Sequence, residues 1–250
     1  MTSKSVTAVL NGHTNPVVGI AILENGNVIS GASDNTIKIW DMETKSCIGT
    51  LKGHSSFVRS VAVLKNGNLV SGSSDKSLII WNLQMQTINA TLLGHTNIVN
   101  SVAVLRNGNI ISGSSDLSVK MWDVETKTCI ATFKGHTSDV NAVLELPDGN
   151  LISGSDDYTI KIWNVTTRMC IGTLRGHVSQ VTSLGILQNG YVVSGSIDST
   201  IKIWNLKTST CVATLVGHSG WIRSLSVFRN DYIVSGSDDN TIKIWGNQST

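Results

Sequence analysis

A repeat of 41 residues runs through almost the whole chain. A Gly-His pair and a tryptophan each recur six times at this spacing, with no insertion or deletion between copies. The pairs begin at Gly12, Gly53, Gly94, Gly135, Gly176 and Gly217, and the tryptophans are Trp40, Trp81, Trp122, Trp163, Trp204 and Trp245. Such a period is typical of an array of equal units, each of which buries its apolar face only against its neighbours.

Each repeat has the pattern of four short strands. In the first repeat, apolar runs at 17–23, 28–31, 36–40 and 47–51 are separated by turn signals such as Glu-Asn-Gly-Asn and Ser-Asp-Asn. The runs are rich in Val and Ile, which is typical of strands. No segment sustains the apolar period of about 3.6 residues that a helix requires. The sequence therefore predicts an all-β chain built from antiparallel four-stranded units.

The two ends of the chain complement each other. The last repeat ends at Trp245 without a fourth strand, whereas KSVTAVLNGH at 4–13 aligns with KSCIGTLKGH at 45–54. An open array leaves unpaired backbone donors and acceptors at both ends. We therefore expect residues 4–10 to supply the outer strand of the last unit beside 241–245, closing a ring. Two alternatives stay open: the chain is a segment of a longer array, or it closes only by association with another chain.

The chain resembles the WD-repeat β-propeller family over its whole length. Each repeat has Gly-His, then about 27 residues, then Trp-Asp or Trp-Asn, as at Trp40-Asp41, Trp122-Asp123 and Trp81-Asn82. The terminal Trp245-Gly246 departs from the pattern. The resemblance implies one propeller domain over 1–250, with repeats starting at 12, 53, 94, 135, 176 and 217. Many members have seven blades, whereas this chain has material for six, and we expect a closed six-bladed β-propeller of four-stranded antiparallel blades.

Every repeat also carries His, Ser and Asp, the residue types of a hydrolase triad, together with the tryptophan. The resemblance implies a structural hydrogen-bond chain: the indole N–H only donates, a Ser hydroxyl accepts, and the imidazole links that hydroxyl to the Asp. An active site occurs once in a domain, whereas this set occurs six times, which argues against catalysis. The sets are His13/Ser30/Asp34/Trp40, His54/Ser71/Asp75/Trp81, His95/Ser112/Asp116/Trp122, His136/Ser153/Asp157/Trp163, His177/Ser194/Asp198/Trp204 and His218/Ser235/Asp239/Trp245.

Bulk properties exclude several classes of protein. The net charge of +2 comes from 19 basic and 17 acidic residues that are interspersed, unlike the basic patches of nucleic-acid binders. No apolar run reaches the roughly 18 residues of a membrane span, and the N-terminus lacks a secretory signal. We expect a cytoplasmic monomer without a cofactor.

The four cysteines each lie seven residues after a tryptophan, and Ile88 takes that place in the second repeat. We expect Cys47, Cys129, Cys170 and Cys211 to pack as small hydrophobic residues in a strand, and we expect neither a disulfide nor a metal site.

Specificity is expected where the repeats differ. The resemblance implies partner contacts on one rim, at the third and fifth residues after the His and at the residue before the tetrad Asp. The third residues are Pro16, Phe57, Ile98, Asp139, Gln180 and Trp221; the fifth are Val18, Arg59, Asn100, Asn141, Thr182 and Arg223; the last set is Ser33, Ser74, Ser115, Asp156, Ile197 and Asp238.

Trp221 is the only tryptophan off the 41-residue period. Together with Arg223 it matches the pair of Phe57 and Arg59, and on a closed ring Pro16 and Val18 lie between the two pairs. Aromatic and Arg side chains are enriched at binding hot spots, so this arc is the predicted binding site. Further predicted contacts are Ile98, Asn100, Asp139, Asp156 and Asp238, with the fourth blade acidic. An alternative is that Trp221 and Phe57 only begin the innermost strands and pack between blades.

The functional hypothesis is a non-catalytic scaffold that binds a peptide or protein segment on this rim. An acidic or phosphorylated segment with an apolar anchor suits the guanidinium groups. The alternative is a designed or recently duplicated propeller with no evolved ligand, which the close similarity of the repeats favours. An enzyme needs a unique polar cluster in the central channel, and the sequence offers none.

Overall fold

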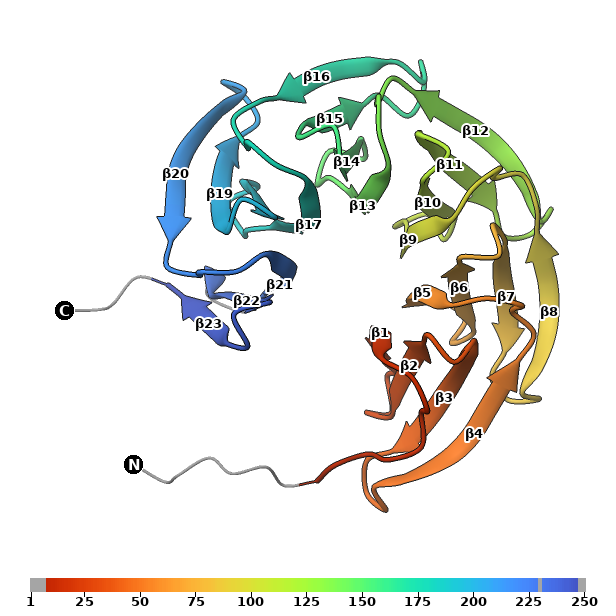
Figure 1. The fold of residues 1–250 in the computed structure, drawn as a ribbon. Helices are drawn as coiled ribbons and strands as arrows, with labels where there is room; N and C mark the ends of the chain where they lie inside the picture. Colours follow the sequence, from red (N-terminus) through yellow and green to blue (C-terminus); the bar gives the residue numbers. More distant parts are fainter. Residues whose placement is uncertain (1–7, 229–230, 247–250) are drawn as a thin grey trace.

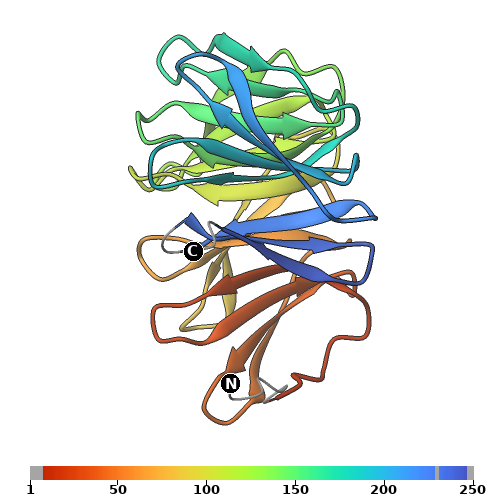
Figure 2. The same cartoon turned by 90° about the vertical axis from the view of Figure 1, so that its left-hand side faces the viewer.

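The computed structural model describes residues 8–228 and 231–246. Six separate antiparallel sheets follow one another along the chain, and we number them as blades 1 to 6. Figure 1 shows them arranged like the blades of a propeller around a central opening. Figure 2 shows the same blades from the side. The fold is the six-bladed propeller that the sequence predicts, and all the elements within the described ranges are strands.

Five blades have four strands each in the order of the chain, and blade 6 has three in the described part. The strands are β1 Val17–Ile22, β2 Val28–Ala32, β3 Thr36–Asp41 and β4 Ser46–Lys52 in blade 1; β5 Val58–Val63, β6 Leu69–Ser73, β7 Leu78–Asn82 and β8 Thr87–Leu92 in blade 2; β9 Val99–Val104, β10 Ile110–Ser114, β11 Ser118–Asp123 and β12 Thr128–Lys134 in blade 3; β13 Val140–Glu145, β14 Leu151–Ser155, β15 Ile160–Trp163 and β16 Cys170–Leu174 in blade 4; β17 Val181–Ile186, β18 Val192–Ser196, β19 Thr200–Asn205 and β20 Thr210–Val216 in blade 5; and β21 Ile222–Val227, β22 Ile233–Ser237 and β23 Ile242–Trp245 in blade 6.

The first strand of each blade lies nearest the central opening and the fourth lies at the outer circumference (Figure 1). Tight hairpins make this radial order. In blade 1, Gly26 adopts a φ of 86° in the first hairpin and Asn35 a φ of 66° in the second, a region that Gly and Asn tolerate best. The Asn-Gly and Asp-Asn turn signals of the sequence therefore lie where the chain reverses.

The core lies between the blades. At the junction of blades 4 and 5, Ile152 and Ile160 of blade 4 pack with Val181 and Leu184 of blade 5 in one buried cluster. Gly154 in β14 allows this close approach, because a Cβ atom there would lie 2.6 Å from Val181 Cγ1. Each blade thus presents one apolar face to the blade before it and another to the blade after it.

A hydrogen-bonded tetrad ties the strands of every blade together. In blade 3, Trp122 Nε1 donates to Ser112 Oγ at 2.8 Å, Ser112 Oγ lies 2.7 Å from His95 Nε2, and His95 Nδ1 lies 2.7 Å from Asp116 Oδ2. Because the Asp116 carboxylate only accepts, we assign the proton to Nδ1 and let Ser112 donate to Nε2. The predicted hydrogen-bond chain is confirmed in this geometry, and it recurs in all six blades.

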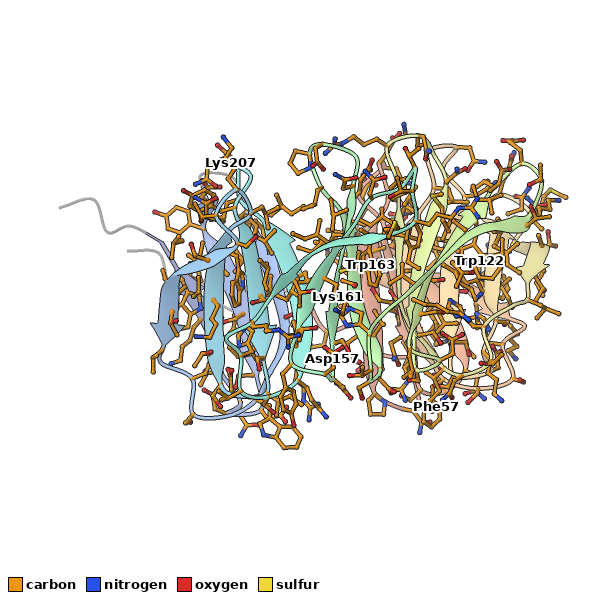
Figure 3. The ribbon with its side chains drawn as sticks, turned by 90° about the horizontal axis from the view of Figure 1, so that it is seen from above. Phe57, Trp122, Asp157, Lys161, Trp163 and Lys207 are labelled. Atoms are coloured by element: carbon orange, nitrogen blue, oxygen red, sulfur yellow. The ribbon has the colours of Figure 1, made fainter. Side chains whose placement is uncertain are left out.

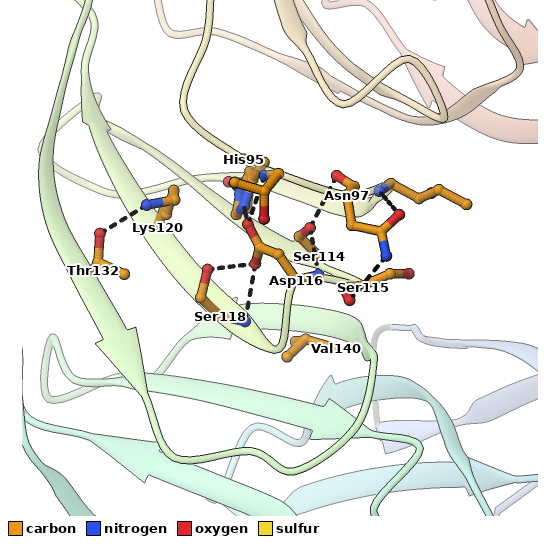
Figure 4. Close-up of polar contacts among 12 residues, drawn as sticks. His95, Asn97, Ser114, Ser115, Asp116, Ser118, Lys120, Thr132 and Val140 are labelled. Atoms are coloured by element: carbon orange, nitrogen blue, oxygen red, sulfur yellow. Dashed lines mark hydrogen bonds and ion pairs between the residues drawn. The ribbon is translucent and has the colours of Figure 1, made fainter.

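The tetrad carboxylate has further donors, as Figure 4 shows for Asp116 beside Ser118. Burial raises the pKa of Asp116, but the hydrogen bonds from His95 and Ser118 outweigh it and hold that pKa well below its ordinary value. The six tetrads therefore keep their carboxylates ionised and fully hydrogen-bonded, as members of the scaffold.

The four cysteines lie in strands, as predicted, but the prediction that they pack as small hydrophobic residues is wrong. All four are exposed, on the outer strands β4, β12, β16 and β20. The fourth strands lie at the outer circumference of the ring, where neighbouring blades diverge and cover the faces of these strands less than they cover the inner strands (Figure 1). Cys47 Sγ, for example, donates to the Gly49 carbonyl at 3.2 Å. Among the described residues no group of three or more His, Cys, Asp or Glu side chains is arranged to hold a metal ion.

An opening separates blade 6 from blade 1, on the side where the described part of the chain begins and ends (Figure 1). The predicted closure concerns residues 4–10, of which 4–7 lie outside the described residues and 8–10 belong to no strand. Ring closure therefore stays a prediction. In the described ranges no helix is long and apolar enough to span a membrane.

Candidate functional site

The propeller has two rims, which Figure 3 shows with Phe57 on one of them and Lys207 on the other. We call the first the Phe57 rim. It is formed by the loops that lead into the first strand of each blade and by the hairpins between the second and third strands. All three predicted contact positions of each repeat belong to these loops and to the strand ends beside them.

A backbone hydrogen bond joins the third residue after the His to the residue before the tetrad Asp. The Asp156 N–H donates to the Asp139 carbonyl at 2.8 Å, and the Asp238 N–H donates to the Trp221 carbonyl at 2.9 Å. The reason is the antiparallel pairing of the first two strands of a blade, which continues to the rim. Residues about 17 positions apart in sequence are therefore neighbours on the Phe57 rim.

In blades 2, 3, 4 and 6, the fifth residue after the His donates a side-chain hydrogen bond to the residue before the tetrad Asp. Asn100 Nδ2 donates to Ser115 Oγ at 3.0 Å, and Asn141 Nδ2 donates to Asp156 Oδ1 at 2.6 Å. In blade 2, Arg59 Nε donates to Ser74 Oγ at 2.9 Å. Two variable positions that look independent in sequence are thus a donor and its acceptor.

Some of these side chains also link one blade to the next. Asn141 Nδ2 donates to the Val181 carbonyl at 3.1 Å, and Thr182 Oγ1 donates to the Ile222 carbonyl at 2.6 Å. These donors stabilise the blade junctions on the inner edge of the rim. Part of the variation that the sequence analysis assigned to partner contacts therefore serves the scaffold.

The fifth residues converge on one hollow of about 240 Å³ on the Phe57 rim. Its lining includes all six of them, from blades that are far apart in sequence. They are Val18, Arg59, Asn100, Asn141, Thr182 and Arg223. Asp156, Gln180 and Ile197 complete the lining. Four of these lining residues are absent from the predicted contacts, although they occupy the same variable positions of blades 4 and 5: Asn141, Gln180, Thr182 and Ile197.

Blade 4 contributes negative charge to this rim. Asp139 accepts a hydrogen bond from Ser115 Oγ of blade 3 at 2.6 Å. Burial, together with the charges of Asp139 and Asp157, raises the pKa of Asp156 in spite of the hydrogen bond from Asn141. The hollow therefore has an acidic side at blade 4 and a basic side at Arg59.

Trp221 is half-exposed, with 48% of its surface accessible, and it borders a second hollow of about 300 Å³. Ile197 and Ser199 of blade 5 form the opposite wall of this hollow. Arg223 Cζ lies 4.8 Å from the centroid of the Trp221 ring, within the range of a cation–π contact. The contact with Arg223 helps to hold in place the aromatic side chain that lines this hollow.

The two arginines of the predicted arc differ in what they offer a partner. Arg223 donates from Nε to Asp238 Oδ1 at 2.9 Å and from a terminal nitrogen to Asp238 Oδ2 at 2.7 Å. This ion pair raises the pKa of Arg223, and the Asp238 carboxylate neutralises the guanidinium charge. Arg59 lies over Phe57 at 5.9 Å, and its only hydrogen bond among the described residues is the one to Ser74.

The structure brings together only part of the predicted arc. Phe57 and Trp221 are both exposed at the ends that precede β5 and β21. Pro16 and Val18 are exposed beside β1, but the opening lies between blade 1 and the blade that carries Trp221 (Figure 1). Ile98 is partly buried at the start of β9.

A family model described as "WD domain, G-beta repeat" matches the chain six times, at residues 4–41, 45–82, 86–123, 127–164, 168–205 and 209–246. Among solved structures, the "Crystal structure of WD40 beta propeller domain of Doa1" is similar, with a TM-score of 0.85 and 27% sequence identity. The match covers 93% of this chain and 79% of that chain. No curated protein sequence matches this chain.

Proposed function

Because the chain belongs to the WD40 repeat family, whose propellers are generally non-catalytic scaffolds that bind proteins or peptides, we propose that it binds a peptide segment on the Phe57 rim. One observation carries the proposal. The positions that vary between repeats gather around the hollows of this rim, whereas the tetrads beneath them are the same in all six blades. Variation on a constant scaffold is typical of a binding surface.

The chemistry of the rim suggests which peptide it takes. The hollow beside Trp221 suits an apolar or aromatic side chain, because its opposite wall includes Ile197 and the charge of Arg223 is neutralised by Asp238. Arg59 retains terminal donors for a carboxylate or a phosphate. We therefore assign the acidic or phosphorylated residue of the partner to Arg59, and the apolar anchor to Trp221.

The test is selection from a displayed library of random peptides. The wild-type chain enriches peptides with an apolar anchor and an acidic residue. Trp221→Ala combined with Arg223→Glu abolishes capture, and Arg59→Glu removes the acidic preference, while the melting temperature barely changes because these side chains lie at the surface. Lys207→Glu, on the opposite rim, is the matched control and leaves the selection unchanged (Figure 3). Unchanged capture by the double variant contradicts the proposal.

A second candidate is a duplicated or designed propeller without an evolved ligand. It is favoured by the repetition of the tetrad, whose Nδ1–carboxylate distances are 2.7 or 2.8 Å in every blade. This candidate predicts that neither the peptide library nor a proteome-wide pull-down yields a partner above background. Treatment of captured partners with phosphatase separates a phosphate-dependent contact at Arg59 from a carboxylate contact.

We place the protein in the cytoplasm as a monomer. Cell fractionation tests the location, and the mass in solution tests the oligomeric state.

A further inference from the structure

Two exposed apolar side chains on the Phe57 rim occupy positions that are polar in most other repeats. Tyr158 lies in the hairpin between β14 and β15 and is 48% exposed, and Val178 follows the tetrad histidine of blade 5 and is 80% exposed. We call these two residues the apolar pair. The residues equivalent to Tyr158 are Asn35, Lys76, Leu117, Ser199 and Asn240, and those equivalent to Val178 are Thr14, Ser55, Thr96, Thr137 and Ser219.

The apolar pair belongs to two loops that meet at the junction of blades 4 and 5. At the junction of blades 1 and 2, the equivalent residues are joined by a hydrogen bond from Asn35 Nδ2 to the Ser55 carbonyl at 3.5 Å. At the junction of blades 5 and 6, the equivalent Ser199 and Ser219 line one hollow. Because the repeats contain no insertion or deletion, the same two loops lie together at blades 4 and 5.

The apolar pair contributes little to the stability of the fold. Tyr158 has a φ of 68°, in the left-handed region that Asn and Gly adopt more readily than Tyr. Its five equivalents share this conformation, and two of them are Asn. Apolar surface that stays in water also gives no hydrophobic stabilisation. A strained backbone under an exposed aromatic ring, beside an exposed valine, is typical of a binding surface.

The apolar pair is continuous with the surface beside Trp221. Gln180 lies two residues after Val178, and its carbonyl accepts a hydrogen bond from the Ile197 N–H at 3.0 Å. Ile197 is in turn a wall of the hollow that Trp221 borders. The loops of blade 5 therefore connect the apolar pair with the Trp221 hollow, so that one extended partner segment reaches both.

Unpaired negative charge lies in the same loops of blade 4. Asp156 comes two residues before Tyr158, and its N–H donates to the Asp139 carbonyl at 2.8 Å. The hydrogen bonds to these two carboxylates come from a neutral hydroxyl and a neutral amide, and in the described part of the chain neither forms an ion pair with Lys or Arg. At the equivalent position of blade 6, Asp238 is already paired with Arg223. A basic residue of a partner therefore complements blade 4.

We propose that the partner segment bound at the Trp221 hollow extends to the junction of blades 4 and 5. There it places a second apolar side chain against Tyr158 and Val178, and a lysine or arginine beside Asp156. This inference rests on the function proposed for the Phe57 rim and identifies a second anchor of the same partner. The partner then carries an acidic residue for Arg59, one apolar residue for Trp221, and an apolar residue next to a basic one for blades 4 and 5.

The test replaces the apolar pair with residues that this fold already uses at the same positions. Tyr158→Asn combined with Val178→Ser introduces the residues of blades 1 and 2. The melting temperature is not expected to fall, because Asn suits this φ. Peptides selected from the displayed library on the wild-type chain are expected to contain two apolar residues, one of them beside Lys or Arg. Fluorescence polarisation is expected to show that the double variant binds these peptides at least about tenfold more weakly.

Two further variants examine the charge and the position. Asp156→Asn keeps the Oδ1 acceptor for Asn141, and selection on this variant is expected to lose the preference for Lys or Arg while both apolar preferences remain. Leu117→Asn is the matched control, because it makes the same kind of change at the equivalent exposed position of blade 3. It is expected to leave binding unchanged, since the residue across that junction, Thr137, is polar.

The outcomes separate this inference from the function on which it rests. Binding that is abolished by Trp221→Ala combined with Arg223→Glu, but not weakened by Tyr158→Asn combined with Val178→Ser, overturns the second anchor and leaves the proposed function intact. Selected peptides without a second apolar residue beside Lys or Arg overturn the second anchor as well. If no peptide binds the wild-type chain, both proposals are wrong.

Two measurements without peptide examine other roles of the apolar pair. A clear fall in the melting temperature of the double variant shows that the apolar pair stabilises the fold, which overturns the inference. Native mass spectrometry is expected to show a monomer. A dimer that the double variant disrupts shows that a second copy of the chain covers this surface, and it likewise overturns the inference.

Discussion

Some side chains of this protein have the same role in every repeat, because they make the same hydrogen bonds in every blade. The tetrad serine is the clearest case. Ser153 is fully buried, accepts from Trp163 Nε1 at 2.8 Å and lies 2.7 Å from His136 Nε2. One small hydroxyl therefore satisfies two buried ring nitrogens, and no other residue type of that size supplies both a strong donor and a strong acceptor.

We predict that Ser153→Ala lowers the free energy of unfolding by about 2–3 kcal/mol, because it leaves the Trp163 and His136 nitrogens buried without partners. Urea denaturation measures the change. Ser46→Ala, in the exposed part of β4, is the control and changes stability by less than about 0.5 kcal/mol. An equal loss in both variants shows that burial of the tetrad does not matter.

At the scale of the strand, the second strand of each blade determines how close the next blade comes. Its Ser-Gly sequence places a serine in the tetrad and a glycine at the junction, on opposite faces of one strand. In β14 these residues are Ser153 and Gly154. The strand therefore serves its own blade with one face and the adjacent blade with the other.

Gly154→Ala is expected to destabilise the fold by about 1–3 kcal/mol, since the new methyl group meets Val181 Cγ1 at 2.6 Å and must displace it. Gly236→Ala is the matched variant at the open end, where the nearest atom is 3.3 Å away, and it is expected to be nearly neutral. Thermal unfolding of both variants makes the comparison. A large loss in Gly236→Ala shows that blade 1 covers this face in solution.

At the scale of the molecule, six similar tetrads respond together to pH. Burial raises the pKa of Asp157, but hydrogen bonds from Thr159 and His136 outweigh it and lower that pKa to about 2, from an ordinary value of 3.8. The other five tetrad carboxylates are also lowered. Burial lowers the pKa of His54 and His136 below 6.5, although Asp75 and Asp157 oppose it.

Both kinds of shift have the same sign for stability, because the unfolded chain binds more protons than the folded chain. The contribution of His54 and His136 is complete above pH 6.5 and decreases as the pH falls below that value. The contribution of the tetrad carboxylates to the free energy of unfolding is complete above pH 3.8. It is lost as the pH falls toward about 2. We predict a melting temperature that is constant near pH 8 and falls in two stages on acidification, measured by circular dichroism. A melting temperature that is highest at acidic pH contradicts this prediction.

The sequence by itself determined the six blades, the order of their strands and the members of each tetrad, because a strict period places the same residue types at the same point of every repeat. It did not determine what each variable side chain contacts. The exposure of Cys47 depends on the position of β4 at the outer circumference of the ring, and the neutralisation of Arg223 depends on cross-strand pairing with Asp238. Only the tertiary structure decided these, because each depends on atoms that come together only when the chain folds.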